Sequence, residues 1–314
     1  MSMQIYDMAV IGGGPGGYTA ALYAARAGLN VVVLEQLSAG GQMALTEQID
    51  NYPGFDAGID GFTLGEQMQR GAEHFGAETI LAEVESVELQ EPVKRLKTSE
   101  GIIMTRTVVI ATGATPRPLG IPGEREWTGR GVHYCAACDG MAYRGKTVAV
   151  IGGGNSAAED ALTLSRFAKK VYLIHRRDTL RAEKIYKKQL EEKENVEFCW
   201  NSTVEKLICT ERLTGVQLRN SKDQTMQELL CDGIFVSVGR NPATGLLQGQ
   251  VTMDQAGYLC ADETTRTNLP GVFAAGDVRT KPLRQVVTAA ADGAVAAHFA
   301  EQYLNEQKID AGVN

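Results

Sequence analysis

Two stretches of the chain share one pattern of hydrophobic and polar positions. Residues 7–36 contain a short apolar run at 8–11, a glycine-rich turn, a stretch rich in alanine and leucine, and a second apolar run at 31–34. Short apolar runs bounded by glycine are typical of buried strands, and the longer alanine- and leucine-rich stretch between them is typical of a helix. The pattern predicts a strand–helix–strand (βαβ) unit.

The pattern occurs again over residues 147–176, which align with residues 7–36 without a gap. The matching apolar runs lie at 148–151 and 171–174. A chain of 314 residues is long enough for two domains with separate cores. The repeat therefore predicts an α/β fold with two Rossmann-like dinucleotide-binding domains.

Both glycine-rich turns fit the dinucleotide-binding pattern: GGGPGG at 12–17 matches G-x-G-x-x-G, and GGGNSA at 152–157 matches G-x-G-x-x-A. The first glycine permits a tight turn, the second lets the backbone approach a pyrophosphate, and a small third residue lets helix and strand pack closely. Two such turns in register disfavour the alternative, a glycine turn without a ligand. The predicted cofactor-binding residues here are Gly12, Gly14, Pro15, Gly17, Gly152, Gly154, Asn155, Ser156 and Ala157.

The two copies differ where the second strand ends. The first copy has Glu35, whose carboxylate can accept hydrogen bonds from a free ribose 2′-hydroxyl, as in FAD or NAD. The second has His175, Arg176 and Arg177, with Arg181 close behind. Guanidinium groups bind a 2′-phosphate that a carboxylate would repel, so the second site is predicted to bind NADP(H). The alternative for the three arginines is a solvated basic helix end.

A later apolar strand, within residues 267–277, ends in Gly276 and Asp277. At the carboxyl end of a strand, an aspartate can meet the ribityl or pyrophosphate side of a flavin. Because the second site favours NADP(H), the first is predicted to hold a flavin.

Together these features resemble the pyridine nucleotide-disulfide oxidoreductases with two dinucleotide-binding domains, and among them the low-molecular-weight thioredoxin reductases of bacteria. The resemblance covers nearly the whole chain. It rests on the paired glycine turns and on VIATGA at 109–114, CAACD at 135–139, HRR at 175–177, GRNP at 239–242 and the Gly276-Asp277 pair. It implies FAD and NADPH as cofactors.

The resemblance also implies that the NADPH-binding domain is inserted into the FAD-binding domain. The FAD-binding domain would comprise residues 1–115 and 246–314, and the NADPH-binding domain residues 116–245, which include the dithiol. Proline and glycine near 115–118 and 239–242 agree with crossings of the chain there.

Further cofactor contacts complete the two predicted sites. They are Gly40, Gly41, Gln42, Asn51, Ala111, Thr112, Gly113, Arg284, Gln285 and Val286 for FAD, and Arg240 for NADPH. Residues 284–290 are expected to begin a helix whose amide groups and dipole would stabilise an anionic reduced flavin. Simple helix packing is the alternative for Gln285 and Val286.

Cys135 and Cys138 form a C-x-x-C, which can bind zinc, close a stabilising disulfide or exchange electrons. Zinc needs further ligands, but only His133 lies close by and there is no second cysteine pair, so no metal site is predicted. A stabilising disulfide fits poorly with a cytoplasmic chain, whereas a C-x-x-C at a helix start favours disulfide exchange. The other four cysteines are scattered and are expected to be buried apolar fillers.

Asp139 follows the pair directly and could carry the protons that thiol–disulfide exchange requires. Capping the segment after it is the alternative. The resemblance implies that NADPH reduces the flavin, the flavin reduces the Cys135–Cys138 disulfide, and the dithiol reduces thioredoxin. It also implies that the NADPH-binding domain rotates between the two half-reactions. The predicted catalytic residues are Cys135, Cys138 and Asp139.

Thioredoxin and a second copy of the chain, forming a homodimer, are the partners that the resemblance implies. Arg130 matches a residue that helps to hold the partner, but Met141-Ala142 stands where many relatives have an aromatic docking pair. One alternative is a reductase of another small dithiol protein, either glutaredoxin-like or from a peroxiredoxin system. The reductases of peroxiredoxin systems usually carry an N-terminal extension, and because the first βαβ unit lies at the start of this sequence, we do not expect one here. Another alternative is a redox-sensing flavoprotein without turnover.

Composition and charge add three expectations. The net charge of −7 disfavours nucleic acid as the main partner, because phosphate binding needs clustered lysine and arginine. No apolar run approaches the roughly 18 residues that span a bilayer, so no membrane partner is expected. The N-terminal apolar run follows no basic segment, and the protein is therefore expected to be cytoplasmic.

Overall fold

The computed structural model describes residues 4–46 and 48–310 and divides into two compact units. The first unit comprises Met1–Thr115 and Asn241–Asn314, and the second Pro116–Arg240. The ends of the predicted FAD-binding segments, residues 1–3 and 311–314, lie outside the described residues. The division falls at 240/241, five residues before the sequence-based boundary at 245/246, and the assignment of cofactors to units stays a prediction.

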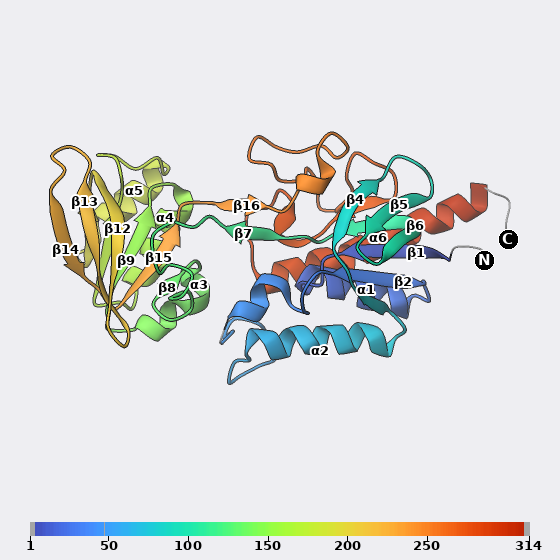
Figure 1. The fold of residues 1–314 in the computed structure, drawn as a ribbon, viewed down its shortest axis with the longest axis horizontal. Coiled ribbons are helices and arrows are strands. Elements are labelled where there is room, and N and C mark those ends of the chain that lie inside the picture. Colours follow the sequence, from blue (N-terminus) through green and yellow to red (C-terminus); the bar gives the residue numbers. More distant parts are fainter. Residues whose placement is uncertain (1–3, 47, 311–314) are drawn as a thin grey trace. The chain divides into compact units, whose positions relative to one another are not determined.

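The first unit is built on one seven-stranded sheet, in the order β3-β2-β1-β6-β5-β4 with β17 also on β6 (Figure 1). β1, β2, β3, β6 and β17 are parallel, whereas β4, β5 and β6 form an antiparallel meander. The elements are β1 (Ile5–Ile11), α1 (Pro15–Arg26), β2 (Val31–Glu35), η1 (Gly41–Leu45), α2 (Gly61–His74), β3 (Glu78–Leu81), β4 (Val84–Glu88), β5 (Lys94–Thr98), β6 (Gly101–Ile110), β7 (Ala114–Pro116), β16 (Arg240–Pro242), η3 (Gly245–Leu247), β17 (Val272–Ala274), η4 (Gly276–Val278) and α6 (Val286–Asp310).

Both faces of this sheet are covered, which explains why β1 is apolar at nearly every position. Met8 and Val10 pack into a cluster with α1 and α6, whereas Ala9 and Ile11 pack on the opposite face. α1 and α6 lie against each other over that first face. The predicted strand–helix–strand order is confirmed here, since β1 and β2 pair in parallel across α1.

The second unit has a five-stranded parallel sheet in the order β11-β10-β9-β15-β8 and a three-stranded antiparallel sheet β12-β13-β14. Helices α4 and α5 pack on one face of the parallel sheet, and the antiparallel sheet covers the other. The elements are β8 (Val132–His133), α3 (Ala136–Asp139), η2 (Gly140–Tyr143), β9 (Thr147–Gly152), α4 (Asn155–Ser165), β10 (Lys170–Ile174), α5 (Lys184–Glu191), β11 (Val196–Cys199), β12 (Ser202–Cys209), β13 (Leu213–Asn220), β14 (Met226–Leu230) and β15 (Gly233–Ser237).

The second predicted βαβ unit is β9-α4-β10, and it too is confirmed, with β9 and β10 parallel. The chain crosses between the two units at 115/116 and 240/241, and β7 and β16 pair there as a two-stranded sheet. Within the described ranges, no helix is long and apolar enough to cross a membrane.

Candidate functional site

The first glycine turn connects β1 to α1 at the carboxyl edge of the parallel strands. α1 begins with Pro15 at its first position, and its N-cap residue Gly14 supplies no side chain to the free amide groups. A Cβ atom on Gly14 would meet nothing within 4 Å, whereas one on Gly17 would collide with the Gly12 carbonyl. An uncapped helix N-terminus beside open space, reached through a closely packed turn, suits a phosphate group.

Glu35 ends β2 beside this turn. Its Oε2 accepts a hydrogen bond of 2.6 Å from the Gly13 amide, and its Oε1 accepts one of 3.1 Å from the Leu37 amide. A carboxylate has about four acceptor positions, so the ribose hydroxyl predicted for Glu35 still has lone pairs available.

The structure brings the other predicted FAD residues of this unit to the same edge. The Gly40 amide donates to the Gly13 carbonyl at 2.8 Å, and the amides of Ala111 and Ala275 donate to Ile11 and Ile110 at 2.9 Å. These bonds place the segments Gly40–Gln42, Ala111–Gly113 and Gly276–Asp277 around the glycine turn. Small residues at the carboxyl ends of parallel strands, where the strand order reverses, fit a dinucleotide.

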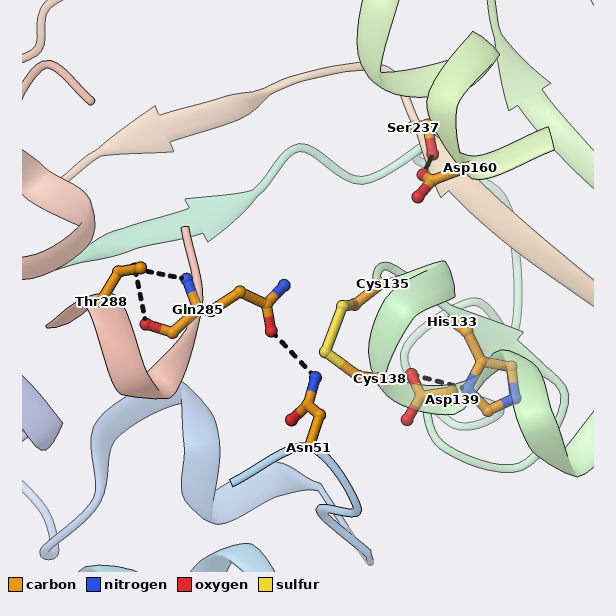
Figure 2. The surroundings of a disulfide bond; sticks show 9 residues. All are labelled: Asn51, His133, Cys135, Cys138, Asp139, Asp160, Ser237, Gln285 and Thr288. Atoms are coloured by element: carbon orange, nitrogen blue, oxygen red, sulfur yellow. Dashed lines mark hydrogen bonds and ion pairs between the residues drawn. A yellow bond between two sulfur atoms is a disulfide. The ribbon is translucent and has the colours of Figure 1, made fainter. Parts of the chain in front are cut away.

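The helix expected over residues 284–290 begins at Val286. The amide of Gln285 donates to Thr288 Oγ1 at 3.1 Å, and its side chain accepts from Asn51 Nδ2 at 3.1 Å (Figure 2). Arg284 Nε donates to the Asp277 carbonyl at 3.4 Å. The first turn of α6 is thus tied to two of the other predicted FAD segments.

The glycine turn of the second unit has the same construction. Gly154 is the N-cap of α4, offers no side-chain cap, and has open space where a Cβ would stand. Asn155 and Glu183 exchange two hydrogen bonds of 2.9 Å, which tie the helix start to the segment after β10.

The predicted phosphate-binding cations collect beside this second turn. The Arg181 amide donates to the Gly153 carbonyl at 2.7 Å, and the buried ring of His175 lies directly against Gly153. Burial lowers the pKa of His175, as do the charges of Arg181, Arg176 and Arg177. All three arginines are exposed and lie in an irregular segment before α5 rather than at the end of a helix. Three exposed guanidinium groups beside an uncapped helix fit a pyridine nucleotide with an additional phosphate.

Cys135 and Cys138 form a disulfide with a Cα–Cα distance of 5.3 Å, and Cys135 is the N-cap residue of α3 (Figure 2). The amide of Asp139 donates to the Cys135 carbonyl at 3.1 Å. Asp139 makes no side-chain cap to the turn that follows, so the capping alternative is wrong. Its Oδ2 instead lies 3.2 Å from Nδ1 of His133.

The four remaining cysteines are expected to be buried, but only one of them is. Cys231 is buried, but Cys199, Cys209 and Cys260 are only partly buried. Burial raises the pKa of Cys199 to about 11 and that of Cys231 to about 12, which keeps both as unreactive thiols. Among residues 4–46 and 48–310, no three His, Cys, Asp or Glu side chains gather as metal ligands.

A family model described as pyridine nucleotide-disulphide oxidoreductase matches residues 6–293. The chain belongs to this family. Membership implies a flavin and a pyridine nucleotide as cofactors, which is the chemistry that both glycine turns fit.

Several relatives match this chain over nearly its whole length. The thioredoxin reductases of Listeria monocytogenes and Streptomyces clavuligerus are 44% and 45% identical to it; the matches cover 97% and 96% of this chain, and 96% and 94% of theirs. The solved thioredoxin reductase of Streptococcus pyogenes is 43% identical, covers 97% of this chain and 100% of its own, and has a TM-score of 0.91. That of Lactococcus lactis, titled as the FR conformation, is 40% identical over 96% and 99%, with a TM-score of 0.68.

Sequence reasoning missed three polar side chains of this oxidoreductase that the tertiary structure brings to the predicted sites. Asp292 on α6 accepts from the Gly276 amide at 2.9 Å and forms ion pairs with Arg279 at 2.7 Å and Lys281 at 2.6 Å. Asp160 on α4 accepts a hydrogen bond from Ser237 (Figure 2). From the sequence alone, His133 is a candidate only for zinc binding. Its position two residues before Cys135 was the one available signal.

Proposed function

We propose that this chain is an NADPH-dependent thioredoxin reductase that contains FAD and cycles the Cys135–Cys138 disulfide. The observation that carries the proposal is this disulfide, which closes at the start of α3 in the unit whose glycine turn lies beside clustered arginines. Relatives named thioredoxin reductase that match nearly the whole chain support it.

In this proposal, the unit with β1 and α1 holds FAD and the unit with β9 and α4 holds NADPH. When bound, the flavin accepts a hydride from the nicotinamide and supplies two electrons to the disulfide. Glu35 binds a ribose 2′-hydroxyl, whereas Arg176, Arg177 and Arg181 bind the 2′-phosphate that distinguishes NADPH from NADH. Arg240 and the amides at the start of α4 complete the second site.

The dithiol passes its electrons to the substrate in two thiol–disulfide exchanges. One cysteine thiolate attacks the substrate disulfide, which breaks, and a mixed disulfide forms as one substrate thiolate leaves. The second cysteine thiolate then attacks the mixed disulfide, so that the Cys135–Cys138 bond forms again and the second substrate thiolate leaves. Two electrons and two protons reach the substrate, and Asp139, adjacent to Cys138, carries the protons.

Rotation of the NADPH-binding unit between the half-reactions is part of the proposal. The chain crosses between the units at two short segments, which is what a hinge requires. Two relatives of nearly equal identity have whole-chain TM-scores of 0.91 and 0.68, and the second is titled as the FR conformation. A change in the mutual orientation of two domains lowers a whole-chain score in this way.

The proposed partner is oxidised thioredoxin, and the proposed assembly is a cytoplasmic homodimer. Arg130 is the candidate for binding the partner. Its guanidinium carbon lies over the Trp127 ring, 5.5 Å from the centroid, and this contact holds the Arg130 side chain in place. Met141 is 50% exposed on η2 and replaces part of the aromatic docking pair. This replacement favours, as a second candidate, a different small dithiol protein of glutaredoxin or peroxiredoxin systems.

The test is NADPH-dependent reduction of thioredoxin by the purified flavoprotein, followed by NADPH absorbance. We expect turnover with oxidised thioredoxin, and none with Cys135→Ser or Cys138→Ser. The same variants should still oxidise NADPH with a quinone, because that acceptor takes electrons from the flavin directly. Absence of a thioredoxin-dependent rate in the unmodified enzyme would contradict the proposal, and a rate with a glutaredoxin-like protein instead would favour the second candidate.

A further inference from the structure

His133 links the carboxylate beside the disulfide to a buried tyrosine. Nδ1 of His133 lies 3.2 Å from Oδ2 of Asp139, and Nε2 lies 2.8 Å from the Tyr143 hydroxyl. The side chain of His133 is 8% exposed and that of Asp139 is 25% exposed. Figure 2 shows the His133 ring beside Asp139, next to Cys138, and the same ring reaches the buried Tyr143 through its other nitrogen.

The imidazole ring is held in this orientation from two sides. It stacks on Phe235 of β15 with ring centroids 5.2 Å apart, and it meets the Tyr143 ring edge to face at the same separation. β8 and β15 pair in parallel with His133 opposite Phe235, so the backbone fixes the stack as well. The ring therefore cannot turn away from Asp139 without breaking core packing.

The partners of His133 satisfy the ring in both of its charge states. In the neutral state, Nδ1–H donates to Asp139 and Nε2 accepts from the Tyr143 hydroxyl. In the protonated state, both nitrogens donate and the tyrosine oxygen accepts. Uptake of a proton needs only a rotation of one hydroxyl hydrogen, and both ring nitrogens keep a hydrogen-bond partner.

The surroundings keep the tyrosine able to take both roles. Burial raises the pKa of Tyr143 to about 12, and the nearby Asp139, Asp232 and Cys231 add to the rise, so the hydroxyl stays protonated at neutral pH. The ammonium of Lys146 lies over the Tyr143 ring, 5.2 Å from its centroid. From β15, the apolar Phe235 stacks on the histidine, and the Asp139 carboxylate lies 3.2 Å from its Nδ1.

We propose that His133 is a positioning residue that holds the Asp139 carboxylate and shares a proton with it during thiol–disulfide exchange. The proposal rests on the proposed reductase function. When a substrate thiolate leaves, the protonated His133 ring passes its Nδ1 proton through the Asp139 carboxylate to that thiolate, which leaves the ring neutral with its remaining proton on Nε2 and the carboxylate charged. Imidazole changes charge between about pH 5 and 8, whereas a free side-chain carboxyl does so near about pH 4. An imidazole can therefore supply a proton at a pH where an isolated carboxyl would have lost it.

The test compares two substrates of the chemically reduced protein, without NADPH. An aliphatic disulfide releases a thiolate that needs a proton, whereas an aromatic disulfide releases a stable thiolate that does not. Both rates are measured between pH 5.5 and 9. They depend in the same way on the fraction of enzyme cysteine that is thiolate, so this dependence drops out of the ratio of the aliphatic to the aromatic rate. In the unmodified protein the ratio of the aliphatic to the aromatic rate should fall as pH rises, because only the aliphatic thiolate needs a proton from the protein.

His133→Asn keeps an amide donor near the Nδ1 position but cannot take up a proton. We expect the fall in the rate ratio to occur at lower pH than in the unmodified protein. Near pH 7, the rate with the aliphatic disulfide should be about tenfold lower than in the unmodified protein, and the rate with the aromatic disulfide should stay within about twofold of it. His74→Asn, at the exposed end of α2, is the matched control and should leave the ratio unchanged. An unchanged ratio profile in His133→Asn would overturn the proposal.

Tyr143→Phe provides a second test if the asparagine variant does not fold. It keeps the aromatic packing and removes the hydroxyl that accepts from the protonated ring, so the fall should shift in the same direction by a smaller amount. A profile identical to that of the unmodified protein would again overturn the proposal. Because the exchange assay uses no NADPH, its result is independent of whether the enzyme reduces thioredoxin in turnover.

Discussion

At the scale of single residues, the second unit contains a carboxyl group whose environment opposes its charge. Burial raises the pKa of Asp160, and the hydrogen bonds from Ser237 and from the Ala136 amide oppose the rise. Ala136 is the first residue of α3, between the two cysteines, so this carboxyl supports the backbone of the redox loop. Protonation of Asp160 is therefore more favourable in the folded protein than in the unfolded chain.

The sign of this shift predicts how stability depends on pH. Because the pKa of Asp160 is raised in the folded protein, protonated Asp160 stabilises the fold. This contribution to the free energy of unfolding is complete below the pKa of the unfolded chain, about 3.9, and it is lost as pH rises through the pKa of the folded protein. Asp160→Asn keeps an acceptor for Ser237 and removes the titration. We expect the melting temperature of the variant, relative to that of the unmodified protein, to increase as pH rises from 5 to 8. Thermal unfolding of both proteins at each pH measures this difference. An equal difference at all pH values would show that Asp160 stays charged.

At the scale of elements, the helices that begin at the two glycine turns depend on close backbone contact rather than on side-chain caps. A Cβ on Gly17 in α1 would collide with the Gly12 carbonyl, whereas one on Gly71 in α2 would meet nothing within 4 Å. The two positions therefore separate the packing role of glycine from its low helix propensity.

A matched pair of alanine substitutions tests this difference. Gly17→Ala should destabilise the protein by about 2–4 kcal/mol, because the turn must open to admit the methyl group. Gly71→Ala should stabilise it by about 0.5–1 kcal/mol, since alanine favours the helix interior. Urea unfolding monitored by circular dichroism measures both. A loss at both positions would mean that the α1 contact has no special role.

The start of α6 depends on a buried network of charges. Asp292 balances Arg279, which is 5% exposed, and Lys281, and it also fixes the Gly276 amide. Removing one partner of a buried pair leaves the other charge uncompensated, which costs about 3–5 kcal/mol. The network therefore couples the end of β17 to the first turns of α6.

Asp292→Asn should consequently lower the free energy of unfolding by about 3 kcal/mol and weaken retention of the flavin. Denaturant titration gives the first quantity, and the flavin absorbance that remains after dialysis gives the second. Glu301→Gln, farther along the same helix, is the control and should change neither. Full stability with full flavin retention in the aspartate variant would show that the two cations find other partners.

At the scale of the whole molecule, each unit has its own sheets and its own hydrophobic clusters. The chain passes between them at two points, so each unit is expected to respond to its own ligand. This separation is the physical basis for assigning one cofactor to each glycine turn.

Removal of the flavin tests that assignment through hydrogen exchange. Exchange should rise by about tenfold or more at residues 12–17, 40–42 and 276–286 and stay within about twofold at 152–157. Addition of NADP⁺ should protect 152–157 and 175–181 instead. Mass spectrometry of the matching peptides measures both responses. Protection of the first turn by NADP⁺ would reverse the assignment.

The sequence by itself determined the two βαβ units, their glycine turns and the redox pair. These features depend on local patterns: apolar runs, glycine at fixed spacing, and two cysteines three residues apart. The charge difference between Glu35 and His175-Arg176-Arg177 was also readable, because both stand at matching positions of a repeat.

Only the tertiary structure decided which polar side chains meet. Asp160 and Ser237 lie 77 residues apart in the chain, and the ring of His133 is fixed by Phe235 from a different strand. No local pattern specifies such contacts, because they follow from strand order and from which residues share a face of a sheet. The disulfide was predictable from its spacing. The acid, the imidazole and the tyrosine that lie behind it became a connected group only when β8, α3 and η2 packed together.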